Sequence, residues 1–289
     1  MFAPERPLVI GHRGAPGYLP EHSLDSYRLA MRQGVDAVET DVVMSKDGIL
    51  VVRHENELSR TTDVALRPEF ADRRTTKRVG RKKVTGWFTE DFTLAELTAL
   101  GAPTEQHRVI TLDQLLLLVE DESARAGRRI GLHVEVKHPG YFAGLGLPMM
   151  AALLETLRDH GVENPGSRLW IQSFDADFVR RIALHTTLPL VQLLDCDWSE
   201  VDCAEIATYA EAIGPKKSMV QKKGQPATPL VDLAHAHGLG VFVYTLRKGV
   251  HQARMYFDAG VDGVFTDYPD RCVQALRELV AESLVEETA

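Results

Sequence analysis

The sequence lacks the long apolar run that a membrane-spanning helix needs, because none of its hydrophobic stretches approaches about eighteen residues. The first residues, Met1 to Pro7, lead directly into a short apolar stretch and leave no room for the hydrophobic core of a signal peptide. We therefore predict a protein without a membrane span that works in the cytoplasm.

The sequence also has few cysteines, and its basic residues are fewer than its acidic ones. The three cysteines, Cys196, Cys203 and Cys272, are odd in number and scattered, which argues against a disulfide framework or a zinc site and fits a reducing compartment. The formal net charge of -8 argues against a general affinity for nucleic acid or for an anionic membrane surface. Any anionic ligand must then be attracted locally.

What the sequence does contain is a repeated alternation of short β-branched runs with amphipathic stretches. The predicted strands are 8–11, 37–43, 49–54, 130–137, 168–173, 189–194, 241–246 and 262–266, with a possible ninth near Met219 and Val220. The predicted helices are 23–33, 112–125, 149–160, 175–185, 202–212, 229–238, 249–259 and 269–283.

This alternation favours a parallel (β/α)₈ TIM barrel, an α/β fold, over an open sheet. No dinucleotide-binding glycine fingerprint follows a strand, which weakens the open-sheet alternative. The link Ser45–Gly48 is too short for a helix, so the barrel is expected to be slightly irregular there. We predict one barrel domain over 1–289, with an insertion at 55–92 between the third and fourth strands.

The insertion carries a charge anomaly. Between Arg67 and Lys83 there are eight basic residues against two acidic ones, in a protein of net charge -8. One interpretation is a solvated mobile loop. The other is a cap over the barrel mouth whose field attracts anions.

Polar side chains gather where the predicted strands end, which is where a barrel of this type builds its active site. Glu39 and Asp41 are two residues apart and so share one face of a strand, as do Glu135 and Lys137. Three inward carboxylates repel one another unless a cation or structural basic partners neutralise them. Oxygen ligands of this kind suit one Ca²⁺ or Mg²⁺ ion better than zinc.

Two histidines and two basic residues surround this predicted cation site. His12 and Arg13 follow the first strand, His54 closes the third, and Lys137 ends the fourth. Fixed positive charge beside a metal suits a phosphoryl group, and a pair of imidazoles can serve as general acid and general base near neutral pH.

Three other histidines fit structural roles better. His235 and His237 lie two apart in a predicted helix and so do not face one another. His133 precedes Glu135 by two residues and is expected one layer deeper in the barrel, in a hydrogen-bonding core role.

Taken in order, these segments resemble the glycerophosphodiester phosphodiesterase family. The resemblance runs from residue 8 to about 272 and is carried by His12-Arg13-Gly14, Pro20-Glu21-His22-Ser23, Glu39-Thr40-Asp41, Asp47-Gly48, Val51-Val52-Arg53-His54, Glu135-Val136-Lys137, Ser173-Phe174-Asp175 and Asp262-Gly263-Val264-Phe265-Thr266-Asp267. It implies a barrel of the phosphatidylinositol phospholipase C-like group that releases an alcohol and sn-glycerol 3-phosphate from a small glycerophosphodiester. The long insertion is similar to that of the longer bacterial subgroup, whose better-known members use calcium.

The resemblance also implies roles for single residues. It implies that His12 and His54 are the catalytic acid and base, with their order left open, and that the metal ligands are Glu39, Asp41 and Glu135. The predicted substrate-binding residues are Arg13, Lys137, Tyr244 and Arg247. The chain departs from the usual family pattern at His22-Ser23, Glu55 and Tyr244, where Asn-Thr, Asp and Trp are common.

Two alternatives stay open at this point. A phospholipase D-like barrel acting on intact phospholipids or lysophospholipids would call for an exposed apolar loop near the mouth, whereas the insertion is basic and polar. A barrel that binds phosphodiesters without turnover would not need both histidines and all three carboxylates.

Overall fold

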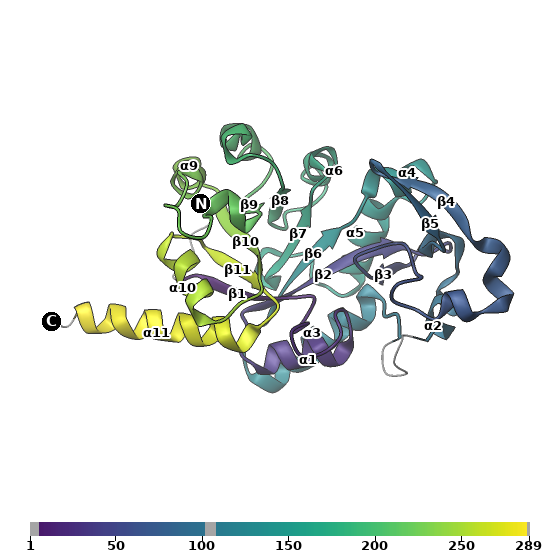
Figure 1. Cartoon of the computed structure of the whole chain (residues 1–289), viewed down its shortest axis with the longest axis horizontal. Helices are drawn as coiled ribbons and strands as arrows, with labels where there is room; N and C mark the ends of the chain where they lie inside the picture. The colour runs from purple at the N-terminus through teal and green to yellow at the C-terminus, as the bar shows by residue number, and fades with distance from the viewer. Residues whose placement is uncertain (1–5, 102–107, 288–289) are drawn as a thin grey trace.

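Eight parallel strands close into a TIM barrel surrounded by helices, as the sequence predicts (Figure 1). The computed structural model describes residues 6–101 and 108–287. Pairing of the first strand with the second closes the barrel. Its strands are, in chain order, β1 (Leu8–His12), β2 (Ala37–Met44), β6 (Gly131–Val136), β7 (Leu169–Ser173), β8 (Leu190–Leu194), β9 (Ala212–Pro215), β10 (Gly240–Leu246) and β11 (Gly263–Thr266).

Side chains of the barrel strands alternate between two cores because successive residues of a strand point to opposite faces. Val38, Val134 and Val264 belong to the large outer core between barrel and helices. Trp170 and Phe242 belong to a small apolar cluster inside the barrel. The same alternation sends the odd-numbered residues of β2 and β6 inward, where the apolar layer gives way to polar side chains at the carboxyl ends of the strands.

Helices follow the predicted pattern closely where their end signals are strong. The helix that begins after Thr111 has a capping box with Gln114 and ends at Gly127, whose φ is 61°. Among the described residues, no helix is both long and apolar enough to cross a membrane. The helices are α1 (Leu24–Arg32), α2 (Leu94–Ala99), α3 (Leu112–Ala126), α4 (Pro139–Gly144), α5 (Met149–Asp159), α6 (Ala176–Ile182), α7 (Cys203–Ile206), α8 (Lys217–Val220), α9 (Leu230–Ala236), α10 (Val250–Asp258) and α11 (Pro269–Glu287).

Two strand predictions are wrong. The predicted third strand, 49–54, is β3 (Leu50–Val52), which pairs antiparallel with β2 and lies outside the closed barrel. Its direction follows from the tight turn before it, since a parallel partner needs a long crossover. The missing barrel strand is β9, at the end of the predicted helix 202–212, while the possible strand near Met219 is helix α8. β9 escaped prediction because AIGP is short and has no alternating pattern.

The insertion 55–92 is built largely from short elements between β3 and α2, at one side of the molecule (Figure 1). It comprises 3₁₀ turns at Val64–Leu66, Pro68–Arg73 and Thr89–Asp91 and the antiparallel hairpin of β4 (Thr75–Val79) with β5 (Lys82–Gly86). Two further 3₁₀ turns, Pro165–Ser167 and Trp198–Glu200, lie elsewhere in the chain. Trp87, Phe88 and Phe92 are buried, so this segment has an apolar anchor of its own.

Candidate active site

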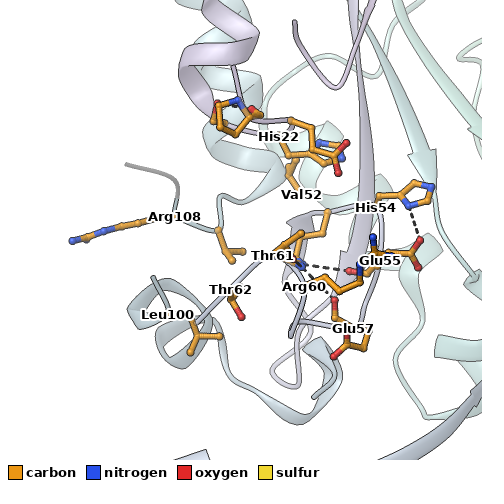
Figure 2. Close-up of a pocket in the computed structure, with 15 residues that line it drawn as sticks. His22, Val52, His54, Glu55, Glu57, Arg60, Thr61, Thr62, Leu100 and Arg108 are labelled. Carbon is orange, nitrogen blue, oxygen red and sulfur yellow. Dashed lines mark hydrogen bonds and ion pairs between the residues drawn. The ribbon is translucent and has the colours of Figure 1, made fainter. Parts of the chain in front are cut away.

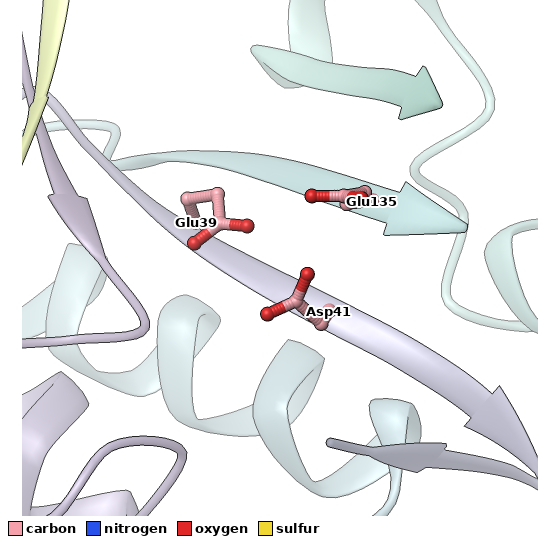
Figure 3. Close-up of side chains that lie close together, drawn as sticks. All are labelled: Glu39, Asp41 and Glu135. Carbon is pink, nitrogen blue, oxygen red and sulfur yellow. The ribbon is translucent and has the colours of Figure 1, made fainter. Parts of the chain in front are cut away.

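Three carboxylates meet inside the barrel, two from the middle of β2 and one from near the carboxyl end of β6 (Figure 3). Glu39 and Asp41 share the inner face of β2, and the parallel register places Asp41 beside Glu135 of β6. One oxygen from each of the three carboxylates lies within 4.8 Å of the others. All three side chains are buried, and Asp41 is completely inaccessible. The prediction that spacing and strand pairing bring these residues together is confirmed.

The electrostatics of this cluster favour a bound cation. Burial and the neighbouring charge of Asp41 raise the pKa of Glu39 well above its usual range, and burial raises the pKa of Glu135 to about 8. Burial alone would raise the pKa of Asp41 too, but the charges of Lys137 and Arg13 hold it well below its usual range. Within the described part of the chain, Oδ1 of Asp41 is buried without a hydrogen-bond partner. An ion coordinated by oxygen would satisfy that atom, so the residues fit a divalent cation.

Arg13 and Lys137 bring positive charge to the carboxylates from two strands. Nε of Arg13 lies 2.9 Å from Oδ2 of Asp41, and its NH1 lies 2.8 Å from Oε2 of Glu21. Nζ of Lys137 lies 2.7 Å from Oε1 of Glu135 and 3.6 Å from Oδ1 of Asp41. The structure therefore places both predicted phosphate-binding residues at the cluster, with their charges partly balanced by its carboxylates.

After β1 the chain makes a tight turn at Arg13 and Gly14, which positions Arg13 beside the carboxylates. Arg13 has a left-handed backbone, with φ at 53°, and its N–H donates to Oε2 of Glu39 at 2.9 Å. Gly14 follows with φ at 94°, and a Cβ there would lie 2.6 Å from the backbone carbon of Ser26. Only glycine fits that approach of loop to helix α1.

His12 ends β1 and is held by a carboxylate from the neighbouring strand. Its Nδ1 lies 2.7 Å from Oδ1 of Asp267, just after β11. Burial lowers the pKa of His12, which favours the neutral ring near pH 7. In the neutral ring Nδ1–H donates to the carboxylate, which leaves the lone pair on Nε2. The arrangement suits a general base.

His54 lies at the rim, two residues beyond β3. Because β3 runs back alongside β2, the N–H of Arg53 donates to the carbonyl oxygen of Asp41 at 3.0 Å. Nδ1 of His54 lies 2.8 Å from Oε1 of Glu55, and its side chain is about one-third exposed. With His22 and Glu55 it lines a cavity of about 560 Å³ (Figure 2). His54 thus reaches the mouth from an antiparallel strand, not from the barrel strand predicted to carry it.

The two remaining predicted substrate residues make contacts of their own at the mouth. The hydroxyl of Tyr244 donates to the carbonyl oxygen of Leu194 at 2.7 Å. The ring of Tyr244 packs edge-on against the ring of Phe174, with 5.8 Å between the ring centres. Nε of Arg247 lies 2.9 Å from Oδ2 of Asp267. Arg247 is therefore joined to His12 through a shared carboxylate, whereas the Tyr244 hydroxyl is already occupied by the backbone.

Sequence reasoning missed two residues of this site. Asp267 follows the last predicted strand and belongs to one of the segments that carry the family resemblance, but no site role was predicted for it. His22 departs from the usual family residue, and its Nε2 lies 3.1 Å from Oδ2 of Asp41 while its Nδ1 lies 2.8 Å from the hydroxyl of Tyr27. Burial lowers the pKa of His22 to about 4, so it supports Asp41 as a neutral donor.

Of the histidines assigned to structural roles, His133 pairs in register with Glu39 and lies one layer deeper in the barrel than Glu135. His133 is fully buried, and its ring stacks on that of Trp170 with 5.6 Å between the ring centres. Its Nδ1 lies 3.3 Å from Oε1 of Gln172. His235 pairs with Asp262 at 2.8 Å, outside the barrel mouth.

Comparison with known proteins agrees with this geometry. Residues 12–271 match the glycerophosphoryl diester phosphodiesterase family. A glycerophosphodiester phosphodiesterase of Arabidopsis thaliana is 32% identical over 91% of this chain and 84% of its own length. One from Bacillus subtilis (strain 168) is 32% identical over 93% of this chain and 86% of its own.

A solved structure gives the same result in three dimensions. A phosphodiesterase of Oleispira antarctica, in complex with the product sn-glycerol-3-phosphate, superimposes with a TM-score of 0.73. Its sequence is 26% identical, and the match covers 94% of this chain and 97% of that one.

Proposed function

The chain belongs to the glycerophosphoryl diester phosphodiesterase family, a family of hydrolases, and from this premise we propose that it cleaves glycerophosphodiesters to an alcohol and sn-glycerol 3-phosphate. The observation that carries the proposal is the buried cluster of Glu39, Asp41 and Glu135, flanked by two basic side chains. The solved relative with sn-glycerol-3-phosphate bound supports the choice of product.

Glu39, Asp41 and Glu135 would hold one divalent cation, Ca²⁺ or Mg²⁺, since both prefer oxygen ligands. When bound, such an ion supplies Lewis-acid polarisation of a phosphoryl oxygen. Arg13 and Lys137 orient the phosphate and stabilise the charge that gathers on its oxygens as the ester bond breaks. Both lie within 4 Å of Asp41, so they stand beside the proposed cation site.

The two histidines carry the protons. We assign His12 as the general base, because its contact with Asp267 leaves the lone pair on Nε2. It accepts the proton of the attacking oxygen, which comes from water or from a glycerol hydroxyl of the substrate. Attack by water gives sn-glycerol 3-phosphate directly, whereas attack by the hydroxyl gives a cyclic phosphate that a water molecule must then open. His54 then protonates the oxygen of the departing alcohol, from its position beside Glu55 at the rim.

Tyr244 and Arg247 complete the substrate site, the first through its ring beside Phe174 and the second through its charge beside Asp267. We further propose that 1–289 acts as one barrel domain with 55–92 as its cap. Cys196, Cys203 and Cys272 are all free thiols, which supports the cytoplasm as its site of action.

Single substitutions of the histidines test this function. We expect His12→Ala and His54→Ala each to lower kcat for glycerophosphocholine by about 10²- to 10⁴-fold, the usual contribution of general acid–base catalysis. Release of sn-glycerol 3-phosphate measures the rate. His235→Ala is the matched control, because that histidine lies outside the site. Near wild-type turnover in either His12→Ala or His54→Ala would overturn the assignment.

A further inference from the structure

The turn of the β4–β5 hairpin reaches the active site. Val79 pairs with Lys82, so Gly80 and Arg81 form a two-residue turn, and glycine suits its first position because φ there is 57°. Both turn residues line a cavity of about 680 Å³ together with Glu135 and Lys137. A segment of the insertion and the end of β6 thus share one cavity.

Buried contacts fix the hairpin relative to this cavity. Nζ of Lys77, on β4, lies 3.0 Å from Oε1 of Glu90 and 2.7 Å from Oδ2 of Asp91. The hydroxyl of Tyr141, which itself lines the cavity, also contacts Glu90. Because Glu90 is buried, solvent screens these interactions little. The position of the turn is therefore determined by the same elements that form the cavity wall.

Arg81 is an uncompensated charge in this cavity. Lys137 is paired with Glu135 at 2.7 Å, and Oδ1 of Asp175 accepts from the N–H of Phe178 as the cap of α6. By contrast, no carboxylate of the described residues lies within ion-pair distance of Arg81. The cavity therefore presents one free guanidinium, a group suited to phosphate or carboxylate.

The aromatic surface of the cavity does not suit a cationic alcohol. Phe174 is 44% exposed there, and Nζ of Lys137 already lies 5.7 Å from the centre of its ring. A quaternary ammonium at this ring would lie close to the ammonium of Lys137, in a cavity that Arg81 also lines. Repulsion between like charges would offset the attraction between the ring and the cation.

This cavity and the 560 Å³ cavity adjoin at His54 and Glu55, whose charges act on His138 in the lining of the 680 Å³ cavity, so His54 can serve an alcohol bound there. Residues that follow β1 and β3 line the 560 Å³ cavity, residues that follow β6 and β7 line the 680 Å³ cavity, and β2 lies between β1 and β6. A phosphodiester has two arms. The first cavity mixes carboxylates such as Glu21 and Glu57 with Arg60, a set of donors and acceptors that suits the hydroxyls of glycerol.

We infer that the 680 Å³ cavity receives the alcohol arm and that Arg81 makes the enzyme prefer alcohols bearing an anionic group, a second phosphate or a carboxylate. The inference rests on the proposed hydrolysis of glycerophosphodiesters and deepens it by naming the substrate class. Arg81 acts as a specificity residue and takes no part in proton transfer.

Three substrates of different headgroup charge test the inference: bis(glycerophospho)glycerol, glycerophosphoglycerol and glycerophosphocholine. In Arg81→Gln we expect kcat/KM to fall about tenfold for the anionic substrate, the usual effect of losing a hydrogen bond between charged groups. For glycerophosphocholine we expect it to rise, because a repulsion is lost. Arg78→Gln is the matched control, since it removes the same charge from the same hairpin at a residue outside the cavity lining.

The outcomes separate the inference from the function on which it rests. Equal shifts in Arg81→Gln and Arg78→Gln would mean a general field of the insertion and would overturn a specific contact. Unchanged substrate ratios in Arg81→Gln, in a protein whose thermal unfolding matches the wild type, would also overturn it. Failure of the wild type to hydrolyse any of the three substrates would overturn the proposed function itself.

Discussion

At the scale of single residues, the proposed role of His12 as general base depends on its contact with Asp267. One carboxylate binds Nδ1 of His12 at 2.7 Å with one oxygen and Arg247 at 2.9 Å with the other. Burial lowers the pKa of His12, and the hydrogen bond that Nδ1 donates to Asp267 opposes part of that shift. Asp267 is a positioning residue, since it acts on the reaction through the imidazole.

Asp267→Asn should therefore change both the rate and its pH dependence. We expect kcat to fall at least tenfold, because the amide no longer fixes the productive tautomer. The pKa of His12 should fall further once the carboxylate that raises it is gone. Since the neutral ring is the active base, the acidic limb of the pH–rate profile should move to lower pH. If kcat falls in Asp267→Asn but the acidic limb of the pH–rate profile stays at the same pH, Asp267 has a merely structural role.

Residue spacing predicts part of this site and misses the rest for a physical reason. Glu39 and Asp41 share a face because strands repeat every two residues, and Glu135 joins them through the parallel register. The partnership of His12 with Asp267 depends on side-chain conformations across the pairing of the first strand, β1, with the last, β11. His22 lies in a loop with φ at 63°, where no periodicity applies.

At the scale of elements, β3 and the hairpin of the insertion shape the mouth of the barrel. Because β3 runs antiparallel to β2, Arg53 pairs with Asp41, and His54 follows directly after it. The sequence correctly places His54 after a strand, but the direction and membership of that strand depend on the turn before it. Short strands such as β9 are settled by pairing with their neighbours on both sides, which local sequence does not encode.

The ion pair that anchors the hairpin should contribute measurably to stability. Glu90→Gln keeps the shape of the side chain but removes the charge that faces Lys77 in a buried setting. We expect a loss of about 1–3 kcal/mol in the free energy of unfolding, measured by urea denaturation. Glu69→Gln is the control, since the exposed Glu69 lies 4.0 Å from Arg67. Equal stability of the Glu90→Gln and Glu69→Gln proteins would contradict this account of the anchor.

At the scale of the whole molecule, charge is distributed unevenly. The chain has a net charge of -8, yet the stretch from Arg67 to Lys83 is strongly basic. Arg73 pairs with Glu96 of α2 and Lys77 with Glu90 of the insertion, while Arg81 lies at the cavity. The sequence alone shows that this stretch is basic. The contacts in the folded structure decide which of its basic residues have no carboxylate partner.

The buried carboxylates of β2 and β6 give the barrel the site at which we propose that a divalent cation binds for phosphodiester hydrolysis. Burial and mutual repulsion raise the pKa values of Glu39 and Glu135, which is an unfavourable state that a cation would relieve. The claim concerns the barrel as a whole, since β2 and β6 supply the ligands while β1 and the return strand β3 supply the histidines.

The most direct test is hydrolysis of glycerophosphocholine by the wild-type protein after treatment with EDTA. We predict that chelation lowers the release of sn-glycerol 3-phosphate at least 100-fold and that excess Ca²⁺ or Mg²⁺ restores it. In Glu135→Gln the same addition should restore much less activity, because one ligand has lost its charge. Full activity in EDTA, or equal restoration of the wild type and Glu135→Gln, would contradict the account.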